Sequence, residues 1–471
     1  MKPYKFEIFT KVIEENIRRG IFKPGHKLPS VREIKKQYQI SISTIQNGYE
    51  HLMITGLVES VSKSGYYVAS QSNAEQKHTK LQQNIVVRDA VFKNRLALTT
   101  SLRMGRKISE FNVAAPGDLL VPQKILLRTM QQVIREQGAG LLRYYPSSGL
   151  HELKENIIKR AGTYQTIINY EELIITDGAL QALYISLSAV CGTGDLIAVE
   201  SPCVFSVLEV IRVLKLQVIE IPADPLNGFD VDLFKKACQK NTVKAVVITP
   251  NFHNPTGRML TEDQKLMLLA ISLQHNVAVI ENDIYGDLHF QGQRPANIKR
   301  FDDSGLVLTY SSYAKTLAPG IRLGWLSAGK FTERAEQIKF ALGSTVSPLY
   351  QETITRLLST TTYDRHVRTF RMQLAKNAYF ATNLLASHFP ENTSTATPLG
   401  GYNMWVKLPD RTDMNYFYDQ CEKIGVRFTP GYTFSFSESF EKNFRMVIAD
   451  TFSPKRIEAI KLIGQRLKEN L

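Results

Sequence analysis

Three apolar runs, each followed at once by polar residues, constrain the fold of this chain more than any other feature of its 471 residues. KAVVI leads into TPNFHNPTG (249–257), VAVI leads into ENDIYGD (281–287), and LVLTY leads into SSYAK (311–315). We interpret the three runs as strands of an α/β sheet, in which ligands collect outside the carboxyl ends of the strands. The polar residues after the runs are therefore expected to gather on one rim of the sheet.

One lysine on this rim is suited to capturing a carbonyl group. The amine of Lys315 becomes nucleophilic if burial or a nearby positive charge lowers its pKa, and Arg322 follows seven residues later. Asp283 offers a carboxylate that would keep a pyridinium ion protonated, while Asn254 and Tyr285 offer hydrogen-bond donors. Pyridoxal phosphate needs such a set. Taken singly, the lysine is typical of an exposed surface and the aspartate of a helix cap, so the prediction rests on their combination.

Together these segments resemble the fold-type I, aspartate-aminotransferase-like family of pyridoxal-phosphate proteins, over about residues 109–471. The resemblance implies that Lys315 forms the Schiff base with the cofactor and that Asp283 partners the ring nitrogen. It also implies that Asn254 and Tyr285 donate hydrogen bonds to the phenolic oxygen of the cofactor.

The phosphate group is expected at a second set of residues. By the same resemblance its ligands are Ser312, Arg322 and the backbone amides of Gly178 and Ala179. TDGALQALYISL (176–187) indicates a strand end, a tight turn and a helix start, where free N–H groups favour an anion. Family members often carry serine or threonine where Ala179 stands, so one side-chain contact to the phosphate is missing here.

Three further residues complete the predicted site by resemblance. Tyr144 in YYPSSG resembles the tyrosine that reaches the phosphate of the partner subunit, which predicts a homodimer. Arg445 in NFRMVIAD resembles the arginine that binds a substrate carboxylate, since a planar guanidinium matches a carboxylate at two points. The aromatic residue that stacks on the cofactor ring is expected near ESPCVFSV; Val204 stands where the ring is usual, so Phe205 is the candidate.

Residues 1 to about 70 have the pattern of a separate small domain. FEIFTKVIEENIRRG indicates a first helix with Phe9, Val12, Ile13 and Ile17 on one face. SVRE (30–33) is a capping box that opens a second helix through Tyr38, and SISTIQNGYEHLMITG a third with Ser41 or Ser43 as cap. LVESVSKSGYYVAS indicates two short strands around residues 62–65. Three helices followed by a two-stranded wing are a winged helix-turn-helix layout.

Three segments of this domain resemble the DNA-binding domain of the GntR superfamily, namely KLPSVREI, ISISTIQNGYEHL and GYYV. This resemblance implies that double-stranded operator DNA is contacted by the second and third helices and the wing, at Arg32, Ser43, Thr44, Gln46, Asn47, Lys63 and Gly65. The family often has arginine or lysine where Ser43 stands, so the operator sequence cannot be inferred from relatives. A helical dimerisation or adaptor module is the alternative.

The distribution of charge agrees with a DNA-binding head. The chain has a net charge of +14; residues 1–108 hold 19 Lys and Arg against 8 Asp and Glu, whereas the remainder holds 39 against 36. A basic front on a nearly neutral body is typical of a nucleic-acid binder.

The whole sequence therefore predicts three parts. Residues 1–70 are the α+β winged helix-turn-helix domain, 71–108 a linker, and 109–471 an α/β body of the fold-type I aminotransferase type. We expect that body to have a mixed, mostly parallel sheet with helices on both faces (about 150–355) and a smaller α+β part (109–149 with 356–471).

Several classes are not supported by the sequence. The start MKPYKFEIF does not have the pattern of a signal peptide, and no membrane-spanning run is found. The four cysteines lack metal-binding spacing, which predicts no metal site and reduced thiols in the cytoplasm. GxGxxG, Walker A and HExxH motifs are missing, so nicotinamide and nucleotide-hydrolase functions gain no support.

A GntR head joined to an aminotransferase-like body resembles the MocR-like subfamily of bacterial transcription regulators. The resemblance implies a pyridoxal-phosphate-dependent regulator that senses a small amine, an amino acid or the cofactor itself through a Schiff base at Lys315, with two heads on a two-part operator. The alternative is an active aminotransferase that carries a DNA-binding appendage. The effector, the target gene and the direction of regulation are not encoded in any motif.

Overall fold

The computed structural model describes residues 5–54, 57–61, 64–69, 85–92, 109–224, 228–343 and 345–471. The chain divides into two compact units, Met1–Gln82 and Gln83–Leu471.

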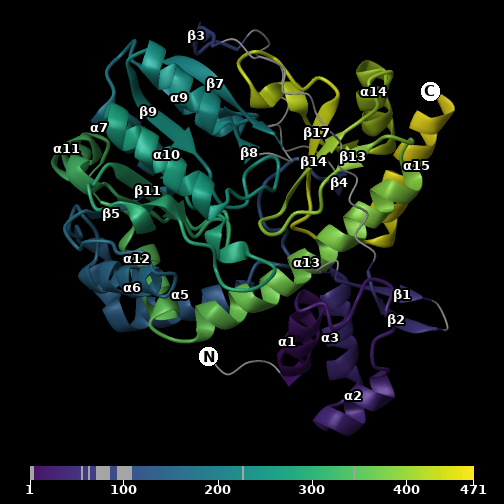
Figure 1. Ribbon diagram of the computed structural model, residues 1–471. Coiled ribbons are helices and arrows are strands. Elements are labelled where there is room, and N and C mark those ends of the chain that lie inside the picture. Colours follow the sequence, from purple (N-terminus) through teal and green to yellow (C-terminus); the bar gives the residue numbers. More distant parts are fainter. Residues whose placement is uncertain are drawn as a thin grey trace. The chain divides into compact units, whose positions relative to one another are not determined.

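The first unit contains three helices and a two-stranded antiparallel sheet (Figure 1). Its elements are α1 (Lys5–Arg18), α2 (Val31–Tyr38), α3 (Ile42–Ile54), β1 (Val58–Val61) and β2 (Gly65–Val68). The core is built from buried side chains on the helices, the wing and the segment before α2, namely Phe9, Ile13, Leu28, Ile34, Ile45, Tyr49, Leu52, Val58 and Val68. This arrangement is the predicted winged helix-turn-helix layout.

Local sequence signals explain where the helices of this unit begin and approach one another. Ser30 Oγ accepts a hydrogen bond from Glu33 N at 3.3 Å and the Glu33 carboxylate accepts one from Ser30 N at 2.6 Å, so the predicted capping box is present. Ser41 Oγ accepts from Thr44 N at 3.1 Å at the start of α3. A Cβ at Gly48 would lie 2.2 Å from Phe9 Cζ, so only glycine lets α1 and α3 come this close.

The second unit is built on a mixed sheet whose strand order, among the described residues, is β3-β7-β6-β9-β10-β11-β12-β5, with β8 paired to β7. Strands β7, β6, β9, β10 and β11 are mutually parallel, and β12, β5 and β3 run antiparallel to their neighbours. The strands are β3 (Val87–Asp89), β5 (Leu173–Thr176), β6 (Leu196–Ser201), β7 (Gln217–Asp224), β8 (Gly228–Phe229), β9 (Val243–Ile248), β10 (Ala278–Asn282), β11 (Val307–Ser312) and β12 (Gly324–Ser327).

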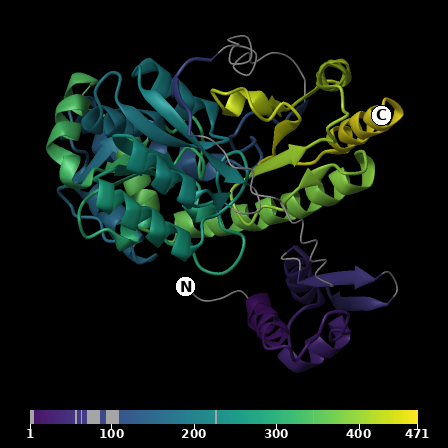
Figure 2. The same ribbon diagram turned by 45° about the horizontal axis from the view of Figure 1, so that its top comes forward.

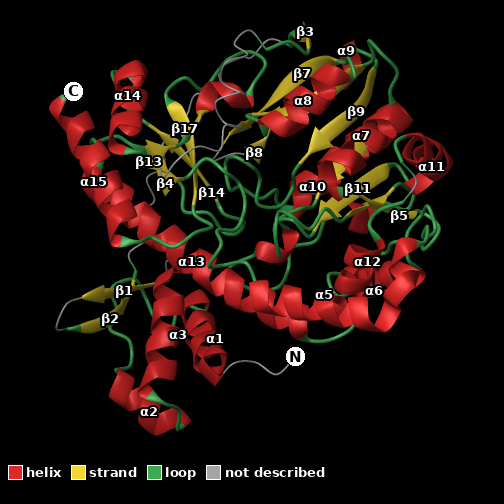
Figure 3. Cartoon of the chain, turned by 180° about the vertical axis from the view of Figure 1, so that it is seen from behind, coloured by secondary structure: helices red, strands yellow, loops and turns green. Residues whose placement is uncertain are grey.

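Both faces of this sheet are covered by helices (Figure 3). Alternate residues of one strand enter different cores: Val246 packs with α9 and α10, whereas Ala245 and Val247 pack with α7 and α8. Continuous apolar strands follow from this double burial. The helices around the sheet are α6 (His151–Gly162), α7 (Gly178–Val190), α8 (Phe205–Val213), α9 (Val231–Lys240), α10 (Glu262–His275), α11 (Thr332–Ala341) and α12 (Pro348–Leu358).

A smaller α+β part is formed by the C-terminal third together with the segment near residue 110. Its antiparallel sheet has the order β13-β14-β17-β16, and β15 pairs in parallel with β4. Its strands and flanking helices are β4 (Ser109–Glu110), β13 (Ser394–Thr395), β14 (Asn403–Lys407), β15 (Val426–Arg427), β16 (Thr429–Pro430), β17 (Asn443–Val447), α14 (Met414–Ile424) and α15 (Pro454–Glu469). Helix α5 (Gln123–Gln137) instead packs on α12 of the larger part (Figure 1).

One long helix, α13 (Thr362–His388), joins the two parts of the body and is the long light-green helix of Figure 2. Its buried residues recur every three or four positions, including Tyr363, Val367, Phe370, Leu374, Ala378, Ala381 and Leu385. Near its middle, the Asn377 amide donates to the carbonyl oxygens of Ile448 and Asp450 at 2.7 and 2.8 Å. Short 3-10 turns complete the unit: η1 (Gly138–Leu142), η2 (Gly286–Leu288), η3 (Ile298–Phe301), η4 (Gly329–Phe331) and η5 (Gly431–Phe434).

The predicted fold class is confirmed, and two local expectations are corrected. Val12 is 42 % exposed, because the buried stripe of α1 passes through Phe9 and Ile13. Within the segment expected to be linker, Val87–Asp89 forms an edge strand on β7. Residues 71–84 and 93–108 of that segment lie outside the described residues.

Candidate functional site

The polar residues predicted to share a rim do follow adjacent parallel strands. Strand β10 lies between β9 and β11, with Glu281 opposite Ile248 and Thr309. Asp283 follows β10 directly; its N–H donates to Tyr310 O at 2.9 Å, and Ser311 Oγ donates to Asp283 O at 3.1 Å. The segments that carry Asn254, Asp283 and Lys315 are thus at one edge of the sheet.

Lys315 lies in the turn after β11, partly buried, and its amine is held by backbone from a distant segment. Nζ donates to Ala114 O at 2.6 Å, and Tyr402 OH donates to the same carbonyl at 3.2 Å. Burial, with smaller contributions from Arg445 and Arg322, lowers the pKa of the Lys315 amine to about 8. An amine with this pKa is partly neutral near pH 7, as carbonyl capture requires.

Tyr285, Asn254 and Arg445 form one connected buried group. Asn254 Nδ2 donates to Tyr285 OH at 3.5 Å, and Arg445 Nη1 donates to Asn254 Oδ1 at 3.0 Å. The Tyr285 ring lies edge-on to Tyr402, with centroids 5.2 Å apart. Burial raises the pKa of Tyr285, so its hydroxyl stays protonated and available as a donor. The two predicted donors to the phenolic oxygen are therefore side by side.

Arg445 on β17 is only 1 % exposed. Its Nη2 donates to Asn112 O at 2.5 Å and to Thr429 Oγ1 at 3.1 Å, while Nε has no hydrogen-bond partner among the described residues. Burial lowers its pKa to about 10, so the guanidinium remains charged at neutral pH, and no carboxylate of the described residues forms an ion pair with it. A buried cation without a counter-ion is well suited to an incoming carboxylate.

Phe205 lies near this cation, whereas Val204 packs into the sheet core. The Phe205 ring centroid is 5.8 Å from Arg445 Cζ and 6.0 Å from the Phe434 ring. This placement is consistent with Phe205 as the aromatic residue of the site and leaves its stacking on a cofactor a prediction.

The residues predicted to bind a phosphate come together at the end of β5. Ser312 pairs with Gly324, and Gly324 pairs with Thr176, so α7 begins next to Ser312. Gly178 has φ +72°, and a Cβ there would lie 2.9 Å from Arg322 Nη2. Ser312 Oγ donates to Leu323 O at 3.1 Å and accepts from Ala314 N. A glycine at this turn leaves its backbone N–H open to an anion. The Arg322 guanidinium lies beside it and is paired through Nε with the exposed Asp177 carboxylate at 3.4 Å.

Arg322 and the neighbouring turn remain accessible. Its Nη2 donates to Asp177 O at 3.2 Å, and its side chain is 50 % exposed. Ala179 is the second residue of α7 and offers the backbone N–H that the sequence predicted. The two backbone amides and the guanidinium therefore lie within one small region.

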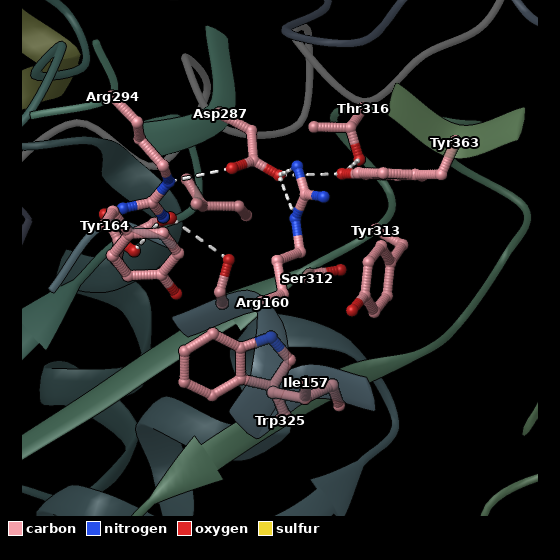
Figure 4. Close-up of a pocket in the computed structure, with 13 residues that line it drawn as sticks. Ile157, Arg160, Tyr164, Asp287, Arg294, Ser312, Tyr313, Thr316, Trp325 and Tyr363 are labelled. Atoms are coloured by element: carbon pink, nitrogen blue, oxygen red, sulfur yellow. Dashed lines mark hydrogen bonds and ion pairs between the residues drawn. The ribbon is translucent and has the colours of Figure 1, made fainter. Parts of the chain in front are cut away.

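Asp283 is fully buried. Next to it is a chain of charged residues that the motifs did not predict, of which Arg294, Asp287 and Arg160 are labelled in Figure 4. Asp283 Oδ2 accepts from Arg294 Nη2 at 2.5 Å, and Asp283 Oδ1 has no hydrogen-bond partner among the described residues. Burial raises the pKa of Asp283, and Arg294 opposes that effect, with a smaller contribution from Asn251. A small cavity adjoins this carboxylate and has about 20 Å³ for the centres of water-sized groups; it is lined by Arg160, Tyr164, Asp287, Tyr313, Trp325 and Tyr363 among others.

Tyr144, which was expected to serve a partner subunit, is 93 % exposed and follows η1. Its position is compatible with a contact to a second chain, and its role stays a prediction.

The head presents a basic surface along its second helix and at the following turn. A hollow there is lined by Arg32, Lys35, Lys36, Gln39, Ile40, Ser41 and Ile42. Arg32 and Gln46 are exposed, and Thr44 Oγ1 is hydrogen-bonded to Ser41 Oγ at 2.7 Å. Gly65 opens β2 with φ +122°. Lys63 and the side chains of Ser43 and Asn47 lie outside what the structure describes.

Sequence reasoning missed the residues that reach the site from distant segments. The carbonyl of Ala114 holds Lys315 and also accepts from Tyr402, the carbonyl of Asn112 holds Arg445, and Arg294 holds Asp283. A backbone carbonyl has no sequence signal. Tyr402 lies in the segment GGYNMW and Arg294 in QRPANIKR. Neither segment contains a recognisable motif, so no pattern pointed to these two residues.

Within the described part of the chain, no cluster of three or more histidine, cysteine or acidic side chains is arranged to hold a metal ion. All four cysteines are free. Among the same residues no helix is both long and apolar enough to span a bilayer.

Comparisons with known proteins agree with the two units. Residues 115–461 match the model of aminotransferase class I and II, and residues 10–68 match bacterial regulatory proteins of the gntR family. The chain is 31 % identical over 469 residues to the HTH-type transcriptional regulator YdcR of Escherichia coli, covering 99 % of this chain and 100 % of that protein. It is 29 % identical to YjiR of the same organism, covering 98 % of each.

Among solved structures, a kynurenine aminotransferase of Pyrococcus horikoshii has a TM-score of 0.74 and 25 % identity, covering 85 % of this chain and 99 % of that one. The α-aminoadipate aminotransferase LysN of Thermus thermophilus has a TM-score of 0.72 and 22 % identity, covering 77 % and 92 %. These likenesses show the fold of the body.

Proposed function

This chain belongs to the aminotransferase class I and II family and joins that body to a gntR-family regulatory domain, and from this premise we propose that it is a pyridoxal-phosphate-dependent, DNA-binding transcription regulator of the MocR-like type. The observation that carries the proposal is the site around Lys315, which lies on the same chain as a basic winged helix. A small amine, an amino acid or the cofactor itself would be the signal.

The residues present fit pyridoxal phosphate. Asp283 Oδ1 is a buried acceptor with no partner among the described residues, which a protonated ring nitrogen would satisfy. Asn254 and Tyr285 would donate to the phenolic oxygen, and Ser312, Arg322, Gly178 and Ala179 would hold the phosphate. When bound, the cofactor supplies an aldehyde that an amine can capture.

The surroundings of Lys315 provide the chemical step of sensing. Its amine has a pKa of about 8, so a useful fraction is neutral near pH 7 and can take the aldehyde. An effector amine would displace Lys315 from that bond and leave its Nζ free to bind elsewhere, for example at Ala114 O. The protein can respond only if the two arrangements bind the effector differently.

Arg445 would give the site a preference for effectors that carry a carboxylate. Its guanidinium is buried, charged and near Phe205, and it is already oriented by Asn254, Asn112 and Thr429. A carboxylate at Nε and a neighbouring N–H would satisfy the one donor that has no partner among the described residues.

We place the DNA contacts on the basic hollow at Arg32 and on the N-terminal half of α3. A homodimer would bring two heads to a two-part operator and would let Tyr144 of one chain serve the phosphate site of the other. Because such a regulator works on DNA, a bacterial cytoplasm is its expected place.

The experiment that tests this function compares turnover with DNA binding. Purified protein loaded with pyridoxal phosphate would be assayed for steady-state transamination with a panel of amino-acid and keto-acid pairs, and for binding to a duplex enriched by the protein from a random-sequence pool. We expect specific DNA binding that changes when amino acid is added, without sustained turnover. Rapid multiple turnover without any change in DNA affinity would instead support an aminotransferase with a DNA-binding appendage, which the retained site residues also permit.

A further inference from the structure

Arg294 contacts the predicted partner of the ring nitrogen, yet no motif or matched role includes it. It stands in the loop after η2, is 11 % exposed, and lies with Cζ 3.4 Å from the centre of the Tyr164 ring. Its Nη2 donates to Asp283 Oδ2 at 2.5 Å and its Nε donates to Asp287 Oδ1 at 2.7 Å. One guanidinium therefore bridges two carboxylates (Figure 4).

The second carboxylate anchors that guanidinium. Asp287 Oδ2 accepts from Arg160 Nη2 at 2.9 Å and from Tyr363 OH at 2.9 Å, and Arg160 Nη1 donates onward to Asp364 at 2.7 Å. Burial alone would raise the pKa of Asp287, but Arg160 and Arg294 hold it well below its usual range. Asp287 therefore stays ionised and keeps Arg294 from following any movement of Asp283.

Asp283 needs such a holder because, among the described residues, only Arg294 and, more weakly, Asn251 contribute hydrogen bonds to its carboxylate. Rotation about the bond between Cβ and Cγ of an aspartate is soft, so a carboxylate without a partner has no preferred oxygen. Arg294 occupies Oδ2, and Oδ1 is the oxygen left without a hydrogen bond. A charge-assisted hydrogen bond of this kind is strong enough to select one orientation.

The glycine at position 286 leaves room for the contact between Arg294 and Asp283. A Cβ at Gly286 would lie 2.5 Å from Arg294 Nη2 and 2.5 Å from Asp283 Oδ1, so any side chain would separate the pair. The φ of Gly286 is not in the left-handed region, so alanine can adopt this backbone conformation. Gly286→Ala therefore crowds both Arg294 Nη2 and Asp283 Oδ1 without removing either charge, so it tests the pair as a whole, whereas Arg294→Lys tests the arginine alone.

We propose that Arg294 is a positioning residue that holds Asp283 Oδ2, so that Oδ1 is presented to the ring nitrogen of pyridoxal phosphate. The proposal rests on the proposed function, since it requires that the cofactor bind in this site. It assigns Asp287 as the anchor of Arg294 and Gly286 as the residue that leaves room for the pair.

The test compares two ligands that differ at one atom. Dissociation constants would be measured by absorbance for pyridoxal phosphate and for its 1-deaza analogue, in which a C–H group replaces the ring nitrogen. We expect Arg294→Gln and Gly286→Ala to weaken pyridoxal phosphate by about 10- to 100-fold, the usual cost of losing a group that orients a charged ligand contact. The analogue cannot use Asp283 in this way, so its affinity should fall by less than about threefold.

A matched control separates positioning from general damage. Arg456→Gln removes a partly buried arginine that pairs with Asp450 and takes no part in the chain of contacts that runs from Asp283 to Arg160. It should change the affinities for both ligands by the same factor. In the Asp283→Asn background, Arg294→Gln should add no further selective loss for pyridoxal phosphate, because Arg294 acts through Asp283.

Equal losses of both ligands in Arg294→Gln and Gly286→Ala would overturn the proposal and leave Arg294 a purely structural residue. If Arg294→Gln does not fold, Gly286→Ala and Arg294→Lys, which keep the positive charge, carry the same comparison. A wild-type protein that binds neither ligand would refute the proposed function instead, so the two failures are distinguishable.

Discussion

Replacing Arg322 by glutamine should make Lys315 less reactive at neutral pH, and the surroundings of the amine set the size of the effect. With a pKa of about 8, roughly one tenth of the Lys315 amines are neutral at pH 7. An ordinary lysine with a pKa near 10.5 would have roughly 0.03 % in that form, which is about 300-fold less. The environment of Lys315 thus accounts for most of its reactive fraction.

Arg322 contributes the smallest part of that effect, after burial and Arg445. Its side chain is half exposed, so its field at Lys315 is screened by solvent and salt. We expect Arg322→Gln to move the midpoint of Lys315 reactivity upward from pH 8 by less than about one unit. Arg322→Lys retains the charge and should keep the wild-type midpoint.

The assay uses pyridoxal, which lacks the phosphate, so that the loss of a phosphate ligand does not confuse the result. Apoprotein would be mixed with pyridoxal between pH 6 and 10, reduced with borohydride and scored for labelled Lys315 by mass spectrometry. The rate of labelling should rise with pH and reach half its maximum near pH 8 in the wild type. A wild-type midpoint near 10.5, or a downward shift in Arg322→Gln, would refute the account of how this amine is activated.

Three more predictions address separate parts of the molecule. Lys315→Met should raise the free energy of unfolding of the apoprotein by about 1–3 kcal/mol at pH 7. The pKa of the Lys315 amine in the folded protein lies below its unfolded value of 10.5, so the wild type gains stability as pH rises from about 8 to 10.5. In urea unfolding, the advantage of the variant should therefore fade over that pH window. A constant difference from pH 7 to 10.5 would argue against burial of a charged amine. Arg32→Ala should weaken binding of the enriched duplex and reduce by about one the number of counterions released on binding, as read from the salt dependence of the affinity. The cofactor absorbance should be retained, and loss of both signals would mean an unfolded protein. Arg445→Lys should weaken L-alanine by about 10- to 100-fold, as measured by the change in cofactor absorbance, and leave ethylamine nearly unaffected. Equal losses would remove the assigned carboxylate contact.

The fold and the centre of the site could be predicted because their signals are local. Apolar runs that end in TPNFHNPTG, ENDIYGD and SSYAK define both the buried strands and the polar residues that follow them, so Asn254, Asp283 and Lys315 reach one edge by topology alone. The capping box at Ser30 is equally local, and it formed as expected.

The rest depends on tertiary packing, which leaves no local pattern. Lys315 is held by the carbonyl of Ala114, about 200 positions away, and Asp283 by Arg294 in an irregular loop. Helical spacing placed Val12 on the buried face of α1, but close approach of α3 at Gly48 centres that face on Phe9 and Ile13. Spacing identifies a face, and only the neighbouring helix determines where its edges lie.

The central claim is that chemistry at Lys315 controls the binding of DNA by the head. The most direct measurement is fluorescence anisotropy with the enriched duplex, for wild type and Lys315→Ala, each without ligand, with pyridoxal phosphate, and with pyridoxal phosphate plus L-alanine. The account predicts that the dissociation constant of the wild type for DNA changes by about fivefold or more on adding cofactor or amino acid, and that Lys315→Ala shows no such change. A wild-type affinity that is insensitive to both ligands, or an equal change in Lys315→Ala, would contradict it.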